Sequence, residues 1–306
     1  MRDLKNFQDR KDAIDAFDRL WAADAPWILA YTGFSGHGKS TLLDWLEARR
    51  CQPQHTPYAL LGLGEFAAQI GEALNHIVEA PALQAALTPR ARQRFRERRQ
   101  TALEDRNRRR MALTQSQEMR DSAGGQQTLS ANLAEALHEM DRHTEVLIAD
   151  AWLECLATLH DGQRLALLLD NYDTFQDTAS LDDLKFFWNT LERAHYQSPG
   201  LRVVLASRER LRHQDHLRVL QNGAEGETLE PLSSHDSDAL LREMGVGDAA
   251  YRDAVFARLG QGHPLITRMA AEAWLATPGG IPADSVPRLA GRDEAVEWVQ
   301  GRILDQ

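Results

Sequence analysis

The amino-acid sequence predicts an α/β protein in which buried parallel strands alternate with helices, followed by a helical C-terminal region. Three observations predict this class. A glycine-rich loop at 33–40 joins an apolar run to an amphipathic helix. An unbroken aliphatic run, 165–169, ends in an acid. From Ser233 onwards, the apolar spacing is wholly helical.

The glycine-rich loop fits the pattern G-x-x-x-x-G-K-[ST], with Gly33, Gly38, Lys39 and Ser40 in the required places. The apolar residues 27–31 before it are typical of a buried parallel strand. Glycines let a backbone wrap closely around phosphate oxygens, because no Cβ intrudes and positive φ is free. The N–H groups of such a loop and the positive end of the next helix form an anion site. The alternative is a glycine-rich turn with a chance lysine.

The loop is therefore expected to bind a nucleoside triphosphate with Mg²⁺. Lys39 would reach the β- and γ-phosphates, the Ser40 hydroxyl would bind the metal, and Thr41 would lie near the α-phosphate. The expected binding residues of the loop are Gly33, Phe34, Ser35, Gly36, His37, Gly38, Lys39, Ser40 and Thr41.

Composition and charge further limit the kinds of protein that the sequence can encode. The 306 residues are 43% hydrophobic and 26% charged, as in a globular protein with an α/β domain and a smaller second one. The net charge of −10 does not favour nucleic-acid binding overall. Cys51 and Cys155 lack a metal-ligand pattern, so we expect reduced thiols and a cytoplasmic location. A charged N-terminus and the lack of a long apolar stretch predict neither a signal peptide nor a membrane span.

In chain order, residues 1–22 are expected to form a leading segment and an amphipathic helix. Two interpretations of this segment stay open: the helix only covers the sheet, or residues 7–10 lie over an adenine with Arg10 near the base. After the loop helix, residues 58–63 are expected to form the second strand and residues 65–78 a helix.

Residues 90–110 carry ten arginines against three acids, a local charge of 10 − 3 = +7, and the arginines lie all round the predicted helix. We expect a solvated helix, and the alternative is a contact with DNA, RNA or an acidic partner. Polar residues 114–129 are expected to be a flexible turn, and Ser130 is expected to cap the long helix that follows. Residues 85–160 are thus predicted to be a helical insertion between the second and third strands.

The aliphatic run ends at Asp170, as when a central parallel strand delivers a carboxylate to phosphates. Asp170 would hold Mg²⁺ opposite Ser40. Asp173 would orient or deprotonate the attacking water, unless it is an ordinary loop aspartate. After a helix at 181–196, the strand 201–206 leads to Arg208, which is placed to sense a γ-phosphate. The alternative for Arg208 is a surface ion pair with Glu209 or a neighbour.

Residues 228–232 are expected to form a last, short strand, and helices are expected at 233–244, 248–259, 264–274 and 293–304. Gly262 and Pro264 flank the start of the third of these helices, where they would give a rigid backbone that approaches the nucleotide base closely. A plain interhelical turn is the alternative. The expected domains are residues 1–232, which bind nucleotide, and residues 233–306, a helical lid.

Several motifs, in order, resemble one family: Phe7-x-x-Arg10, the phosphate loop, 167–173, 199–209, Leu229-x-Pro231-Leu232 and Gly262-His263-Pro264-Leu265. Together they resemble the STAND class of P-loop NTPases, the signal-transduction branch of the AAA+ ATPases that includes the NB-ARC and NACHT proteins. The resemblance covers residues 1–62 and 163–278, and it leaves the arginine-rich stretch unmatched.

The resemblance implies a five-stranded parallel sheet with a helical bundle behind it. It also implies a switch controlled by ATP and ADP, in which nucleotide exchange allows self-oligomerisation or binding of a protein partner. By position, Arg208 corresponds to the sensor arginine and Pro264 to the proline that packs against adenine. Thr174 follows Asp173 where NACHT members often carry a glutamate, so slow or conditional hydrolysis is expected.

Two other functions stay open. One is a DNA-handling AAA+ ATPase of the initiator or transposition-helper type, which would use the stretch Arg90–Arg110. The other is a structural module that binds nucleotide for folding and never hydrolyses it. The family would lead us to expect a winged-helix domain and a sensor array after Gln306, so the chain is either a module of a larger protein or a compact member.

Overall fold

The computed structural model describes residues 10–22, 24–66, 69–121, 129–160, 162–212, 217–259, 261–289 and 291–304. Five parallel strands form one sheet in the order β2-β3-β4-β1-β5. The strands are β1 (Ile28–Thr32), β2 (Tyr58–Gly62), β3 (Leu165–Asp170), β4 (Leu201–Ser207) and β5 (Ala224–Thr228). The expected five-stranded parallel sheet is confirmed.

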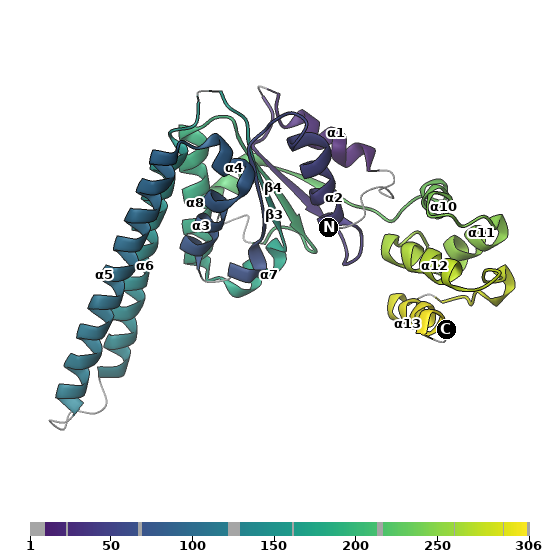
Figure 1. Ribbon diagram of the computed structural model, residues 1–306. Helices are drawn as coiled ribbons and strands as arrows, with labels where there is room; N and C mark the ends of the chain where they lie inside the picture. The colour runs from purple at the N-terminus through teal and green to yellow at the C-terminus, as the bar shows by residue number, and fades with distance from the viewer. Residues whose placement is uncertain are drawn as a thin grey trace.

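Helices cover both faces of the sheet (Figure 1). Alternate residues of a strand point to opposite faces, so β3 sends Leu167 to one apolar cluster and Leu168 to the other. On the face of Leu168 lie α1 (Lys11–Arg19) and α2 (Lys39–Leu46). The face of Leu167 is covered by α3 (Ile70–Glu79), α4 (Pro81–Ala86), α6 (Leu129–Leu156), α7 (Tyr172–Thr178) and α8 (Leu181–Gln197). Short helical turns are η1 (Glu47–Cys51), η2 (Leu63–Phe66) and α9 (Arg218–Gly223).

Two long helices between β2 and β3, α5 (Pro89–Asp121) and α6, pack against each other and extend well beyond the sheet (Figure 1). Ion pairs of Arg98 with Glu154 and of Arg106 with Asp141 show that they run antiparallel. The base of α5 is anchored by Phe95, which is only 1% exposed. The chain between β2 and β3 therefore carries a helical hairpin fixed to the core at one end.

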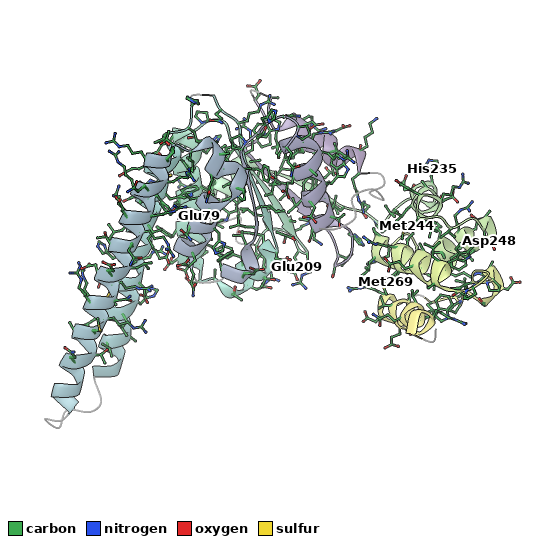
Figure 2. The ribbon with its side chains drawn as sticks, in the orientation of Figure 1. Glu79, Glu209, His235, Met244, Asp248 and Met269 are labelled. Carbon is green, nitrogen blue, oxygen red and sulfur yellow. The ribbon has the colours of Figure 1, made fainter. Side chains whose placement is uncertain are left out.

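The C-terminal helices α10 (Ser234–Glu243), α11 (Ala249–Arg258), α12 (Pro264–Ala276) and α13 (Arg292–Leu304) bury an apolar cluster of their own. The short turn η4 (Ala283–Ser285) precedes α13. The side chains of Ser233 and Asp248 cap α10 and α11 by accepting backbone N–H groups. Met269 lies on the side of this group that faces the sheet, whereas Asp248 lies on the far side (Figure 2).

The last strand was predicted in the wrong place. Residues 229–232 are not in the sheet, and β5 is Ala224–Thr228, whose sequence is AEGET. The N–H of Leu229 still donates to the carbonyl of Thr32, but Pro231 has no N–H with which to continue a ladder. Because β5 pairs with a strand on one side only, most of its residues are not buried, and polar residues are tolerated there.

The helix boundaries also differ from expectation. The flexible turn expected over 114–129 is wrong for its first part, since α5 continues to Asp121 through residues such as Gln and Glu that favour helix. Helix α6 begins at Leu129, so Ser130 lies inside it and does not cap it. The helix expected from residue 65 begins at Ile70, after the turn η2. No helix in the described ranges is long and apolar enough to span a bilayer.

Candidate functional site

The loop after β1 has the backbone of an anion cradle. Gly36 and Gly38 both have φ of 86°, in the left-handed region that favours glycine, and Gly38 is the N-cap of α2. A Cβ added to Gly36 would lie 2.4 Å from Cε1 of His263, so no side chain fits there. A Cβ added to Gly38 would meet nothing within 4 Å. The loop thus closes on the C-terminal helices at Gly36 and faces open space at Gly38.

Lys39, the first residue of α2, curls back over this loop. Its Nζ donates to the carbonyl oxygens of Gly33 at 2.6 Å and Phe34 at 3.0 Å, and the residue is only 8% exposed. Burial lowers the pKa of Lys39, whereas the carboxylates of Asp173 and Asp170 act in the opposite direction. The ammonium group therefore sits at the centre of the loop, within the field of both acids.

A cavity of about 680 Å³ lies in front of the loop. The carboxyl ends of parallel strands share one edge of a sheet, and this edge brings Asp170 from β3 and Arg208 from the end of β4 to the cavity. The predicted site residues that line it are Arg10, Ser35, Gly36, His37, Gly38, Lys39, Ser40, Thr41, Asp170, Arg208 and Pro264. Asp170 and Ser40, the two residues expected to hold Mg²⁺, thus border the same space.

Three predicted residues do not line this cavity: Gly33, Phe34 and Asp173. Gly33 packs against the segment after β5, since a Cβ there would lie 2.9 Å from the carbonyl oxygen of Leu229. Phe34 is 77% exposed and lines a neighbouring cavity of about 600 Å³ together with Asp173. Arg208 borders both cavities.

Asp173 is not a loop residue, which was the alternative to its predicted role in positioning water. It lies in the first turn of α7, is 3% exposed, and its Oδ2 accepts the Nε–H of Arg208 at 2.5 Å. Its Oδ1 accepts the backbone N–H of the same arginine at 3.1 Å. The alternative for Arg208 was an ion pair with Glu209 or a neighbour; the partner in the structure is Asp173, and Glu209 pairs with Arg212.

Arg10 holds the phosphate loop to the segment after β5 through hydrogen bonds to backbone carbonyl groups. Its guanidinium donates to the carbonyl of His37 at 2.9 Å and to the carbonyl of Glu230 at 2.6 Å. These bonds join the start of the described chain, the phosphate loop and the segment after β5. The companion residue of the predicted motif, Phe7, lies outside the described residues.

Two buried histidines connect the loop to α12. The Nδ1 of His37 lies 2.7 Å from the carbonyl oxygen of Leu229, and the Nε2 of His263 lies 3.0 Å from that of Ser35. The two rings meet edge to face, with centroids 5.2 Å apart. A carbonyl oxygen only accepts, so each of these ring nitrogens donates a proton. Through this contact, the turn before Pro264 is held against the phosphate loop.

Several residues of the cavity were missed by the sequence analysis. Asn171 and Thr174 of the β3–α7 segment line it, and so do Arg268, Met269 and Glu272 of α12. Arg268 lies four residues after Pro264, and residues at this spacing share one face of a helix, so the proline could have pointed to it. Leu232, Leu240 and Leu265 complete the apolar wall.

Thr174 also connects the cavity to the turn η2. A Cβ added to Gly64 would lie 2.9 Å from the Cβ of Thr174. The two segments are therefore in direct contact, with no space between them for a side chain at position 64.

The residue types fit a nucleotide with Mg²⁺. A hydroxyl from Ser40 and a carboxylate from Asp170 are hard oxygen donors, and Mg²⁺ is usually held by one or two such groups together with phosphate oxygens. Within the described ranges, no group of three or more His, Cys, Asp or Glu side chains could hold a metal alone. The open space at Gly38 and the ammonium of Lys39 beside it suit a polyphosphate.

Comparison with known proteins gives a distant match. No family model and no curated protein matches the chain. Among solved structures, the chain is similar to a signal transduction ATPase with numerous domains (STAND) protein with a tetratricopeptide repeat sensor from Pyrococcus horikoshii. The identity is 15% and the TM-score 0.46, over 96% of this chain and 32% of that one. The chain thus spans about a third of the length of the protein it matches.

Proposed function

We propose that the chain is an ATP-binding switch ATPase of the STAND type, which couples its ATP or ADP state to protein-partner binding or self-oligomerisation. One observation carries the proposal: a single cavity is lined by Lys39, Asp170, Arg208 and Pro264. The first three side chains follow three different parallel strands, and the fourth comes from the C-terminal helices. We assign residues 1–232 to nucleotide binding, with 85–160 as an insertion, and residues 233–306 to a lid.

In this proposal, the backbone N–H groups around Gly38 and the start of α2 bind the phosphates. Lys39 exchanges its two carbonyl contacts for phosphate oxygens, and Thr41 lies near the α-phosphate. Ser40 and Asp170 would hold Mg²⁺, which would neutralise charge on the phosphates.

The apolar side of the cavity suits a nucleotide base. Pro264, Leu232, Leu240 and Met269 line it, and they come from α10, α12 and the segment before α10. A flat ring buried against such side chains gains from apolar contact. The lid would thus carry most of the base contacts, so that binding of a whole nucleotide draws both parts of the chain together.

Hydrolysis in this proposal is conditional because Asp173 is occupied. Its two oxygens accept from Arg208, so the carboxylate is not free to orient water. A γ-phosphate would compete for the guanidinium of Arg208 and release one oxygen of Asp173. The same exchange would let the chain distinguish ATP from ADP.

The test compares Lys39→Ala with Lys185→Ala, an exposed lysine of α8 that pairs with Asp182. Binding of a fluorescent ATP analogue with Mg²⁺ is measured by anisotropy. We expect Lys39→Ala to lose affinity about a hundredfold or more, about 2.7 kcal/mol, and Lys185→Ala to bind normally. Unchanged affinity in Lys39→Ala would refute the site. Phosphate release by the wild type, compared with Asp173→Ala, separates an ATPase from a module that only binds.

The structure lends less support to the DNA-handling alternative. Of the ten arginines between Arg90 and Arg110, six form ion pairs: Arg96, Arg98, Arg99, Arg106, Arg108 and Arg109. Their partners come from α3, α5 and α6, and Glu79 lies at the junction of α3 and α5 (Figure 2). Much of the local charge is therefore balanced within the protein. Free, buried Cys51 and Cys155 support the proposed cytoplasmic location.

A further inference from the structure

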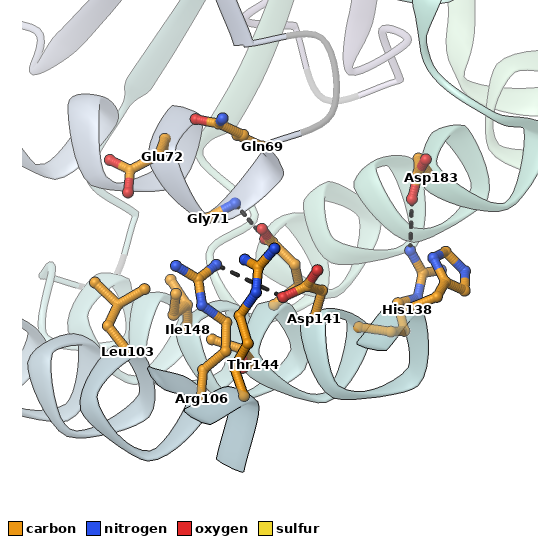
Figure 3. A pocket seen from close by; sticks show the side chains of 13 residues that line it. Gln69, Gly71, Glu72, Leu103, Arg106, His138, Asp141, Thr144, Ile148 and Asp183 are labelled. Carbon is orange, nitrogen blue, oxygen red and sulfur yellow. Dashed lines mark hydrogen bonds and ion pairs between the residues drawn. The ribbon is translucent and has the colours of Figure 1, made fainter. Parts of the chain in front are cut away.

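A second cavity, of about 500 Å³, lies between α3, α5, α6 and α8 (Figure 3). It shares no lining residue with the nucleotide cavity. Its volume falls within the range of small-molecule sites in proteins. Most of its lining is polar or charged: Gln69, Glu72, Arg106, Arg110, His138, Asp141, Arg142, Thr144, Glu145 and Asp183.

Most charges of this cavity are balanced in ion pairs among the described residues, and one acid, Glu145, and one arginine, Arg110, are left over. Arg106 pairs with Asp141, and Arg142 pairs with Asp183 (Figure 3). Glu72 pairs with Arg99, which lies outside the lining. Of the four carboxylates that line the cavity, only Glu145 has no ion pair with an arginine among the residues that the structure describes.

Glu145 is nevertheless held in place. Its Oε2 accepts the backbone N–H of Gly71 at the start of α3 (Figure 3). A Cβ added to Gly71 would lie 2.8 Å from that oxygen, so α3 approaches the acid as closely as a glycine allows. The other oxygen has no hydrogen-bond partner among the described residues, and it is not among their fully buried polar atoms.

The surroundings of Glu145 oppose its negative charge. The pKa of Glu145 is raised to about 7, chiefly by burial, with smaller contributions in the same direction from the carboxylates of Glu72 and Asp183. The hydrogen bond from Gly71 and the charge of Arg106 act in the opposite direction. Asp141 lies one helical turn before Glu145 on α6, and like charges at this spacing destabilise a helix. A cation bound to Glu145 would offset both the cost of burying its negative charge and its repulsion by nearby carboxylates.

We propose that this cavity binds a small molecule that carries a primary ammonium group, which donates to the carboxylate of Glu145. An ammonium group has three donors and a full charge, so it suits an oriented carboxylate with one free oxygen. A metal ion fits less well, since the described residues contain no group of three or more acids, histidines or cysteines arranged to hold one. Arg110 lines the same cavity and forms no ion pair with any residue in the described ranges, so it is available to a second, anionic end of the ligand.

The test uses three four-carbon probes that differ only at their ends: n-butylamine, 4-aminobutyrate and butyrate. Isothermal titration of the full chain at millimolar probe should show binding of the two amines and none of butyrate. The Glu145→Gln variant keeps the volume and an acceptor for Gly71, and it should bind the amines about tenfold more weakly or worse. Glu139→Gln, on an exposed part of α6, should bind like the wild type.

Proton linkage gives a second readout. The ammonium binds only the ionised carboxylate, so amine affinity should rise between about pH 6 and pH 8. At pH 7, binding should release about half a proton per ligand, measured as a dependence of the heat on the buffer. Absence of amine binding, equal binding of butyrate, or normal binding by a folded Glu145→Gln variant would each overturn the proposal. Nucleotide binding is not involved in any of these measurements.

Discussion

Arg208 at the end of β4 and Asp173 in the first turn of α7 hold each other by two hydrogen bonds, one from the side chain and one from the backbone of the arginine. The carboxylate is 3% exposed, whereas the side chain of the arginine is 56% exposed. The exposed partner can therefore move to another anion, while the buried one cannot leave. A substitution of either residue therefore changes the hydrogen bonding of the other.

Removal of this arginine should destabilise the protein. In Arg208→Ala the buried carboxylate of Asp173 keeps only the backbone N–H, and an unsatisfied buried polar group costs about 1–3 kcal/mol. Urea denaturation of Arg208→Ala, Asp173→Asn and the double variant measures the coupling. We expect the double variant to be more stable than the sum of the single effects predicts. Strict additivity would show that the contact contributes nothing.

A second prediction concerns the close approach of the Gly36 backbone to the ring of His263. Gly36→Ala should destabilise the loop in two ways, because the new Cβ meets Cε1 of His263 and because φ is 86°. Adding His263→Ala removes the closest clash but leaves the Cβ of Leu265 at 3.1 Å and the backbone cost, about 1 kcal/mol. We therefore expect thermal melting to show a partial recovery in the double variant. Gly279→Ala, where φ is 81° and a Cβ meets nothing within 4 Å, is the matched control because it carries the backbone cost without the clash.

The buried histidines should make stability depend on pH. Burial lowers the pKa of His37, with Arg10 and Lys39 adding to the effect and Glu230 opposing it. Burial also lowers the pKa of His263, and His37 and Arg292 act in the same direction. The unfolded chain then binds more protons below the ordinary pKa of 6.5, so the free energy of unfolding falls as the pH decreases from there.

Two isosteric variants test this dependence. Asn in place of His37 keeps a donor at the Nδ1 position, and Gln in place of His263 keeps one at the Nε2 position. Urea denaturation at several pH values between about 7.5 and 5.5 should give a shallower slope for the double variant than for the wild type. Burial also lowers the pKa of His195, which is present in both proteins and contributes the same background. Identical slopes would rule out a contribution from the two histidines.

DNA retention should be weak. Four of the ten arginines form no ion pair with the residues that the structure describes, and one of these, Arg92, donates to Gln84. Arg90, Arg94 and Arg110 are therefore the candidates for phosphate contacts on α5. We expect their joint replacement by Gln to leave binding to a DNA column unchanged at physiological salt, since the net charge of −10 repels the polymer. Strong retention that falls steeply with salt, and that is lost in the triple variant, would instead favour the DNA-handling function.

The central strands and the apolar edge strand β2 were predictable from the sequence, whereas the polar edge strand β5 was not, for a physical reason. The strands β3 and β4 are buried on both faces and have neighbours on both sides, so each reads as a continuous apolar run. The edge strand β5 has none of these constraints. The length of α5 was also hard to predict, because the sequence of residues 114–121 is almost wholly polar and only helix propensity marks it as helical.

The candidate site was predictable where its residues lie close together in the sequence. The spacing within the phosphate loop and the acid at the end of β3 are short patterns, and both reach the same cavity. The contact between Arg208 and Asp173 joins residues 35 positions apart and follows from the packing of α7 beside β4. The turn into α7 begins with Asn171 at φ of 56°, a left-handed conformation. No glycine adjoins it in the sequence, so the turn could not be predicted.

The close fit of Gly64 against Thr174 has a mechanical consequence. The turn η2, which contains Gly64, contacts both α7 and α3, so it cannot shift without displacing one of them. Thr174 lines the nucleotide cavity, and the backbone N–H of Gly71 on α3 donates to Glu145 in the second cavity. An unbroken series of contacts, from Thr174 through Gly64 and α3 to Glu145, therefore connects the wall of the nucleotide cavity to the helical hairpin.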